Sequence, residues 1–201
     1  MNPLNTVAGT IIGGIVLAII IALATMGIRF NAVSFIIWIH VMAGITWIGL
    51  LYYFNFVQVP ALADAASDEG GPGGAGITKY VAPRALWWFR WGAAVTWLSG
   101  AAYLGHIGQF ADAFTLGMMG ETMNYPAMII GVGAWFGTIM LFNVWVLIWP
   151  NQKKILGMVE ASADEIAKAR RVAFLASRTN TLLSIPMLMS MVGYGHAGFF
   201  F

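Results

Sequence analysis

The residues from Val7 to Ile28 form an apolar run without a charged side chain. An α-helix needs about 20 such residues to cross the hydrocarbon core of a bilayer. Similar runs cover residues 32–59 and 126–149, and neither contains Asp, Glu, Lys or Arg. With 60% hydrophobic and 9% charged residues, a soluble fold could not hide this much apolar surface. The sequence therefore predicts an all-α integral membrane bundle.

About five transmembrane helices are expected, within a single membrane domain that covers residues 1–201. The second helix is expected to stop at Pro60, because proline has no backbone N–H to donate. A Gly-rich loop is expected at residues 61–83, and a cytosolic amphipathic helix at residues 153–171. The expected spans are residues 7–28, 32–59, 84–106, 126–149 and 172–194, the last one bent at Pro186.

The basic residues predict the orientation of the bundle. With five spans, the amino terminus and the second and fourth loops share one side of the membrane. That side holds all loop and flanking basic residues except Arg29, namely Lys79, Arg84, Lys153, Lys154, Lys168, Arg170, Arg171 and Arg178. Because Lys and Arg accumulate in cytoplasmic loops, we expect a cytoplasmic amino terminus and an outer carboxyl terminus.

Three histidines are candidate ligands for a cofactor. On this topology His40, His106 and His196 all lie toward the outer face, with His40 roughly 10 Å below the boundary. An imidazole in the apolar zone is costly unless it has a partner. Two histidines on facing helices are typical of haem b in a bundle, and Gly44, one turn below His40, would let a flat macrocycle approach the backbone.

These residues predict haem b with His40 as one axial ligand and His106 or His196 as the other. A copper ion is the alternative metal. The competing interpretations are a His40 that is only hydrogen-bonded between helices, or one that relays protons. For His106 and His196, the competing interpretation is simple solvation at the membrane surface.

A polar group is also expected in the cytoplasmic half of the bundle. Arg90 lies inside the third predicted span, and no span contains an Asp or Glu to pair with it. Together with Asn143, Arg178 and Asn180, it is predicted to line a cavity for a substrate or another anion. The alternatives are that Arg90 extends to the cytoplasmic headgroups and that the asparagines join helices by hydrogen bonds.

Composition excludes several other classes of protein. The chain contains no cysteine, which excludes disulfides, thiolate metal sites, iron–sulfur clusters and a covalently attached c-type haem. The formal charge of +2 comes from basic residues in loops and does not suggest a nucleic-acid partner. The expected environment is the lipid bilayer.

Several segments resemble the membrane domain of bacterial cytochrome-c-linked urate oxidase. They are the segment from His40 to Phe54 (HVMAGITWIGLLYYF), the segment from Ala85 to Gly100 (ALWWFRWGAAVTWLSG), the junction from Ile148 to Ile155 (IWPNQKKI), and the stretch from Asn180 to Met191 (NTLLSIPMLMSM) with the following His196. The resemblance runs from about Val33 to His196 in the same order.

This resemblance implies a redox protein of a bacterial inner membrane that passes electrons to cytochrome c. The sequence also departs from the family pattern. It has no carboxyl-terminal cytochrome c domain and fewer spans, it has Gly92 where the family has an acidic residue, and it lacks the family's histidine near Ser177 or Arg178.

Three functions are therefore compatible with the sequence. The first is a redox protein that holds haem b and passes electrons to a separate acceptor. The second is a urate-oxidising enzyme that uses the polar cavity. The third is a non-catalytic accessory subunit that packs against a larger membrane complex.

The orientation can be tested with reporters fused after Phe201. A reporter that works only outside the cytoplasm is expected to be active there, because the basic loops hold the amino terminus inside. The matched control is the same reporter fused after Lys154, which is expected to be inactive. The reverse pattern would overturn the predicted orientation.

Overall fold

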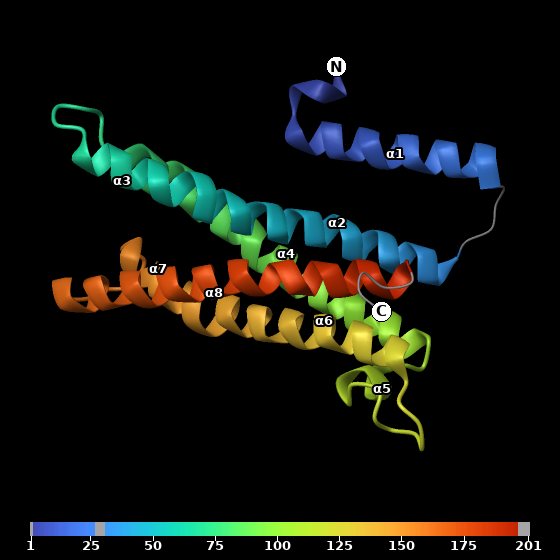
Figure 1. Cartoon of the computed structure of the whole chain (residues 1–201). Coiled ribbons are helices and arrows are strands. Elements are labelled where there is room, and N and C mark those ends of the chain that lie inside the picture. The colour runs from blue at the N-terminus through green and yellow to red at the C-terminus, as the bar shows by residue number, and fades with distance from the viewer. Residues whose placement is uncertain (1, 27–30, 197–201) are drawn as a thin grey trace. The chain divides into compact units, whose positions relative to one another are not determined.

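The computed structural model describes residues 2–26 and 31–196, and within these residues every regular element is helical (Figure 1). The all-α class is therefore confirmed. The chain divides into two compact units, residues 1–34 and 35–201, and each is described separately.

The first unit consists of a short 3₁₀ turn, Pro3–Asn5, and helix α1, Val7–Met26. The hydroxyl of Thr6 accepts a hydrogen bond from the backbone N–H of Gly9 at 3.0 Å, which caps the start of α1. Helix α1 carries no charged residue. The predicted end of this helix at Ile28, and the outer-side Arg29, lie outside the described residues.

The second unit is a helical bundle in which α2, α4, α6 and α8 share one core (Figure 1). Trp47, Leu51, Phe89 and Met140 are each at most 1% exposed in this core. The main helices are α2 (Ala32–Tyr52), α3 (Val59–Ser67), α4 (Ala82–His106), α6 (Tyr125–Phe142), α7 (Trp149–Ile155) and α8 (Ala163–Gly195), with the short α5 (Phe110–Phe114) between α4 and α6.

Helix α8 presents a face of mostly small residues to the bundle. Its buried positions recur every three or four residues, as expected for one face of an α-helix. They are Ala169, Ala173, Ala176, Asn180, Ser184, Met187, Ser190 and Gly193. Small side chains let helix backbones approach closely, which is how helices in membranes gain packing contacts.

Three prolines share one local structure. A π-helical turn precedes each of Pro60, Pro83 and Pro150, and one residue separates the turn from the proline. That residue donates its N–H five positions back: Val59 to Phe54, Ala82 to Ile77, and Trp149 to Val144. A proline ring clashes with the carbonyl four residues earlier in an α-helix. The wider turn relieves this clash, so the helix continues through the proline.

The predicted helix end at Pro60 is therefore wrong. The helix continues as α3 to Ser67, and helical structure resumes at Ala75, before the π-helical turn Ile77–Val81. The Gly-rich loop is thus shorter than the predicted residues 61–83. Gly70 and Gly73 have φ angles of 83° and 64°, a conformation that favours glycine, and both lie in this shorter loop.

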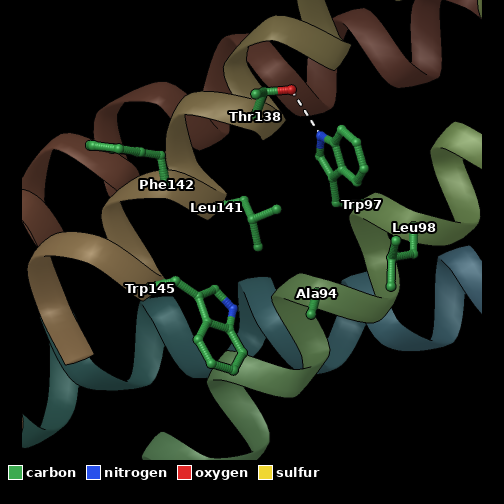
Figure 2. A pocket seen from close by; sticks show the side chains of 7 residues that line it. All are labelled: Ala94, Trp97, Leu98, Thr138, Leu141, Phe142 and Trp145. Atoms are coloured by element: carbon green, nitrogen blue, oxygen red, sulfur yellow. Dashed lines mark hydrogen bonds between the residues drawn. The ribbon is translucent and has the colours of Figure 1, made fainter. Parts of the chain in front are cut away.

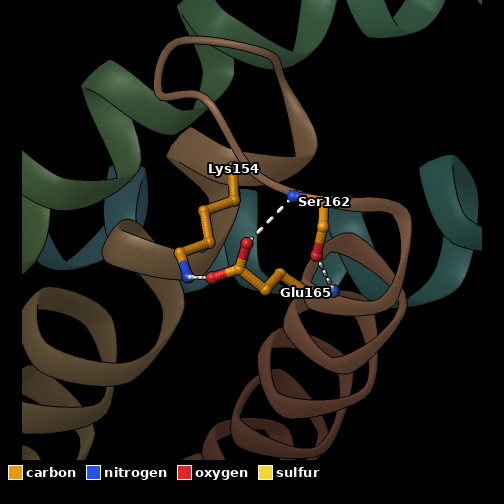
Figure 3. Close-up of polar contacts among 3 residues, drawn as sticks. All are labelled: Lys154, Ser162 and Glu165. Carbon is orange, nitrogen blue, oxygen red and sulfur yellow. Dashed lines mark hydrogen bonds and ion pairs between the residues drawn. The ribbon is translucent and has the colours of Figure 1, made fainter.

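The predicted amphipathic helix at residues 153–171 is also not a single element. Helix α7 ends at Ile155, Gly157 has a φ of 67°, and α8 begins at Ala163. Ser162 and Glu165 form a capping box at this start: the Ser162 N–H donates to Glu165, and the Glu165 N–H donates to the Ser162 hydroxyl (Figure 3). The residues 172–194 form one continuous helix with the residues before them, and Pro186 lies within it.

Three helical stretches are long and apolar enough to cross a membrane: Val7–Thr25, Ala32–Ser67 and Tyr125–Ile155. They coincide with the first, second and fourth predicted spans, which supports a membrane protein. Helices α4 and α8 are not among these three stretches, and crossings by these two helices remain a prediction.

Glu165 links α7 to α8, because its carboxylate also accepts from Lys154 Nζ at 3.2 Å (Figure 3). The hydrogen bond from the Ser162 backbone and the contact with Lys154 lower the pKa of Glu165 below its ordinary value. A carboxyl group with a lowered folded-state pKa stabilises the fold above its ordinary pKa, and this contribution is lost as pH falls through the lowered pKa.

We therefore expect Glu165→Gln to lose less thermal stability than the wild type as pH falls below about 4.5, the ordinary pKa of this carboxyl group. The measurement is the apparent Tm in detergent between neutral pH and pH 3. Asp164→Asn is the control, since the structure gives that neighbouring carboxylate no hydrogen bond. Parallel curves for wild type and Glu165→Gln would show that the link has no energetic role.

Candidate functional site

His40 connects helices α2 and α4. Its Nδ1 lies 2.8 Å from the backbone carbonyl oxygen of Thr96 and 3.3 Å from the hydroxyl of Ser99. The ring is partly buried against α4. The histidine that the sequence places in the apolar zone therefore has a hydrogen-bond partner on a neighbouring helix.

This contact determines the tautomer of His40. A carbonyl oxygen can only accept, so Nδ1 must carry the proton that it donates to Thr96. Ser99 is compatible with this arrangement, because its own hydroxyl donates to the carbonyl of Val95 at 2.6 Å. In the neutral ring Nε2 then keeps its lone pair. Histidines that bind metals commonly donate their second ring N–H to a backbone carbonyl in this way.

Gly100 provides the space for the ring of His40. A Cβ atom at Gly100 would lie 3.0 Å from Cε1 and 3.2 Å from Nδ1 of the imidazole, which is tighter than about nine in ten real Cβ contacts. Gly44 lies near Thr96 of the neighbouring helix. A Cβ atom there would lie 3.8 Å from the methyl group of Thr96, so α4 borders this glycine.

His106 and His196 lie closer to one end of the bundle than His40 does. His106 is exposed and lies about 9 Å further along α4 than Gly100, at about 1.5 Å per residue. Tyr194, just before His196, donates to Gln109 beyond the end of α4, and His196 is exposed as well. The pairing of His40 with either of them remains a prediction.

Metal binding by several side chains is not supported in the described ranges. Residues 2–26 and 31–196 contain no group of three or more His, Asp or Glu side chains arranged to hold a metal ion. The described residues do offer one imidazole in a fixed orientation, that of His40. Such a side chain is suited to a cofactor that binds a single histidine of this protein.

Arg90 packs against tryptophans of the neighbouring helix. Its guanidinium carbon lies 3.3 Å from the ring centroid of Trp149 and 5.6 Å from that of Trp145. Its Nε donates to the carbonyl of Leu86. A stacked guanidinium of this kind gains a cation–π interaction of about 1 to 2 kcal/mol. Arg90 thus contacts the segment that begins with Asn143, but it does not join the asparagine itself.

The structure brings together two of the four predicted cavity residues. Asn143 donates to the side-chain oxygen of Asn180 at 2.8 Å, and Asn180 donates to the carbonyl of Met140 at 3.0 Å. Both side chains are buried, and Asn180 is fully buried. Arg178 points elsewhere: it is exposed, and its guanidinium lies 5.3 Å from the ring centroid of Phe174. The hydrogen bonds of these two asparagines are therefore made to each other and to the Met140 carbonyl, and they link α8 to the end of α6.

Two further polar pairs join α8 to the α2 side of the bundle. Asn55 donates to the hydroxyl of Ser177 at 2.8 Å, and the hydroxyls of Tyr52 and Ser184 lie 3.0 Å apart. Ser177 stands near the place where the family pattern has a histidine. These pairs occupy the region in which the sequence predicts a cavity.

Gly92 stands where helices α2 and α4 come close together. A Cβ atom there would lie 3.3 Å from the backbone nitrogen of Trp47 and 3.5 Å from the carbonyl oxygen of Ala43. The acidic side chain that the resemblance implies at this position would not fit without moving the helices apart. The departure from the family pattern therefore coincides with a closed helix crossing.

Sequence reasoning missed the partners of the predicted residues. Thr96, Ser99 and Gly100 hold the ring of His40, and Trp149 covers Arg90. A weak signal was present, because Thr96, Ser99 and Gly100 recur at spacings of three and four on one predicted helix. Backbone carbonyls such as that of Thr96 leave no signal in the sequence at all.

The asparagine pair makes a testable prediction about stability. Asn180→Ala leaves the buried amide of Asn143 without its acceptor, and we expect a cost of about 1 to 3 kcal/mol. Once Asn180 is gone, Asn143→Ala should cost less than it does alone, with a coupling of about 0.6 to 1.7 kcal/mol. The measurement is a double-mutant cycle of unfolding in detergent, with the exposed Thr179→Ala as control. Additive effects would mean that the pair contributes nothing as a pair.

The comparisons with known proteins concern mainly the second half of the bundle. Residues 113–201 match the model of a family described as urate oxidase N-terminal. No curated protein and no solved structure matches the chain. The matched segment includes α6, α7, α8, the asparagine pair and Trp149, whereas His40 and Arg90 precede it. The resemblance read from the sequence is thus confirmed over this segment, where residues 113–201 are similar to the urate oxidase N-terminal family.

Proposed function

We propose that the protein is a membrane-embedded redox protein that binds haem b through Nε2 of His40 and passes electrons to a separate acceptor. The observation that carries the proposal is the hydrogen bond from His40 Nδ1 to the carbonyl of Thr96. It supports a ring that presents an unprotonated Nε2, the form required of an axial ligand. Bound haem would supply an iron that accepts and releases one electron at a time.

The residues around His40 have distinct roles in this proposal. The Thr96 carbonyl and the Ser99 hydroxyl orient the imidazole and increase its basicity as a ligand. Gly100 lets the ring lie against α4. In this proposal His40 is the one residue of the chain assigned to the haem.

The electron acceptor is proposed to be a separate protein. The related family implies cytochrome c, and this chain contains no Cys-x-x-Cys-His segment with which to attach such a haem itself. Urate oxidation is the less favoured activity. The asparagines that could bind a polar substrate are paired with each other, and Gly92 replaces the acidic residue of the family pattern.

A non-catalytic accessory subunit is the second candidate. The observation that favours it is helix α1, which is apolar around its whole circumference and carries Gly9, Gly13 and Gly14. Such a helix is suited to packing against another membrane helix. Co-purification with a larger complex at fixed stoichiometry, from native membranes and without haem, would favour this candidate.

The haem proposal predicts a visible spectrum. Protein purified in mild detergent and supplied with haemin should show a Soret band, and His40→Ala should lower the bound haem at least about tenfold, because a single axial nitrogen is lost. His106→Ala and His196→Ala are the controls and should keep their haem. Added imidazole should restore part of the band in His40→Ala, which separates loss of the ligand from misfolding. Full haem content in a folded His40→Ala protein would end the proposal.

Gly100→Ala gives a finer test of the same site. The added methyl group pushes on Cε1 of His40, so we expect a shifted Soret band or a several-fold weaker haem affinity, whereas the fold persists. Gly105→Ala is the matched control on the same helix, because a Cβ atom there has no neighbour within 4 Å. Identical spectra and affinities for both variants would mean that the haem does not depend on the position of the His40 ring.

A further inference from the structure

Arg90 and Lys153 are two cations near one aromatic ring. The guanidinium carbon of Arg90 lies 3.3 Å from the centroid of Trp149, and Nζ of Lys153 lies 5.9 Å from the same centroid. Over residues 2–26 and 31–196 the structure contains one ion pair, Lys154 with Glu165, so neither cation has a carboxylate partner. The site therefore has unneutralised positive charge.

The terminal nitrogens of Arg90 remain available to a ligand. The hydrogen bond that the structure gives this side chain comes from Nε, to the carbonyl of Leu86 at 3.2 Å. Stacking on Trp149 uses the face of the guanidinium and leaves its edge free. The edge carries the N–H groups that bind phosphate oxygens in pairs.

An apolar groove begins one helical turn beyond Arg90. It lies between α4 and α6, is open along much of its surface and has a volume of about 470 Å³. Trp97 and Trp145 stand toward its two ends, with Leu141 between them (Figure 2). Trp145 also contacts Arg90, so the groove and the cations are adjacent.

The lining of this groove suits a hydrocarbon chain. The indole N–H of Trp97 donates to the hydroxyl of Thr138 at 2.8 Å, and that hydroxyl donates to the carbonyl of Ala134 (Figure 2). The polar side-chain atoms of Trp97 and Thr138 are thus already paired. Ala94 on α4 has a small side chain at a position where a larger one would reduce the space (Figure 2).

We propose that the cleft between α4 and α6 binds one acidic phospholipid, with its phosphate on Arg90 and Lys153 and an acyl chain between Trp97 and Trp145. The assignment rests on two observations. Arg90 and Lys153 carry positive charge, opposite to that of the phosphate, and they lie beside an apolar groove. A zwitterionic lipid fits the groove equally well but gains less from the two cations. This lipid site is independent of the haem proposal, since His40 takes no part in it.

The test compares phosphatidylglycerol with phosphatidylcholine. Protein reconstituted in equal amounts of the two lipids is extracted in mild detergent, and the retained lipid is counted by native mass spectrometry. We expect wild type to retain phosphatidylglycerol preferentially, and Arg90→Gln to lower that preference about fivefold, the effect of one basic residue at an anionic surface. Arg84→Gln, at the start of the same helix, is the matched control and should keep it. Retention of both lipids in the proportion supplied would overturn the proposal, and so would equal losses in Arg90→Gln and Arg84→Gln.

Two further measurements distinguish a lipid from a free anion. Ala94→Phe should lower phospholipid retention while both cations remain, because it fills the groove. Retention equal to wild type in that variant, with displacement by inorganic phosphate, would overturn the lipid site in favour of a simple anion site. In the unaltered protein, phosphatidylglycerol brominated on its acyl chains should quench tryptophan fluorescence more than brominated phosphatidylcholine. Equal quenching by the two lipids would count against the proposal even if a variant failed to fold.

Discussion

Hydrogen bonds from α8 hold this bundle together. In a bilayer the lipid tails are as apolar as leucine, so the hydrophobic effect does not draw helices toward one another. Ser177 and Ser184 contact the α2 side of the bundle, and Asn180 and Ser190 contact α6. Because these polar residues recur along one face of α8, they fix the rotation and the depth of that helix against both neighbours. The small residues between them allow the backbones to approach.

Much of the helical organisation could be predicted, because apolar runs longer than a bilayer have few other solutions. One wrong prediction concerns a long helix that contains a proline. Proline rules predicted an end at Pro60, but the π-helical turn Tyr53–Gln58 lets the chain continue to Ser67. The break between α7 and α8 depended on Gly157 and on the capping box at Ser162, which are signals of a few residues inside a long polar stretch.

The candidate site was predictable in its residue types but not in its pairings. His40 and Arg90 stood out because each is costly in an apolar environment. Their partners are a backbone carbonyl and the face of an indole ring, and neither pairing is written in local sequence patterns. The predicted cavity rested on four residues with a similar depth along their helices. Depth alone does not set the direction of a side chain, and Arg178 is exposed whereas Asn180 is fully buried.

The wide turns before Pro60, Pro83 and Pro150 bear on how this sequence can change over time. A π-helical turn is equivalent to a single residue inserted into an α-helix, and one residue corresponds to about 100° of rotation. If one amino acid were deleted from Asn143–Ile148 and Pro150 were replaced, ordinary α-helical bonding would return, and Trp149 and Lys153 would turn away from Arg90. Insertions and deletions in these three places therefore act as rotations of whole helix ends. Relatives of this chain that differ in length there should differ in which side chains meet at that end of the bundle.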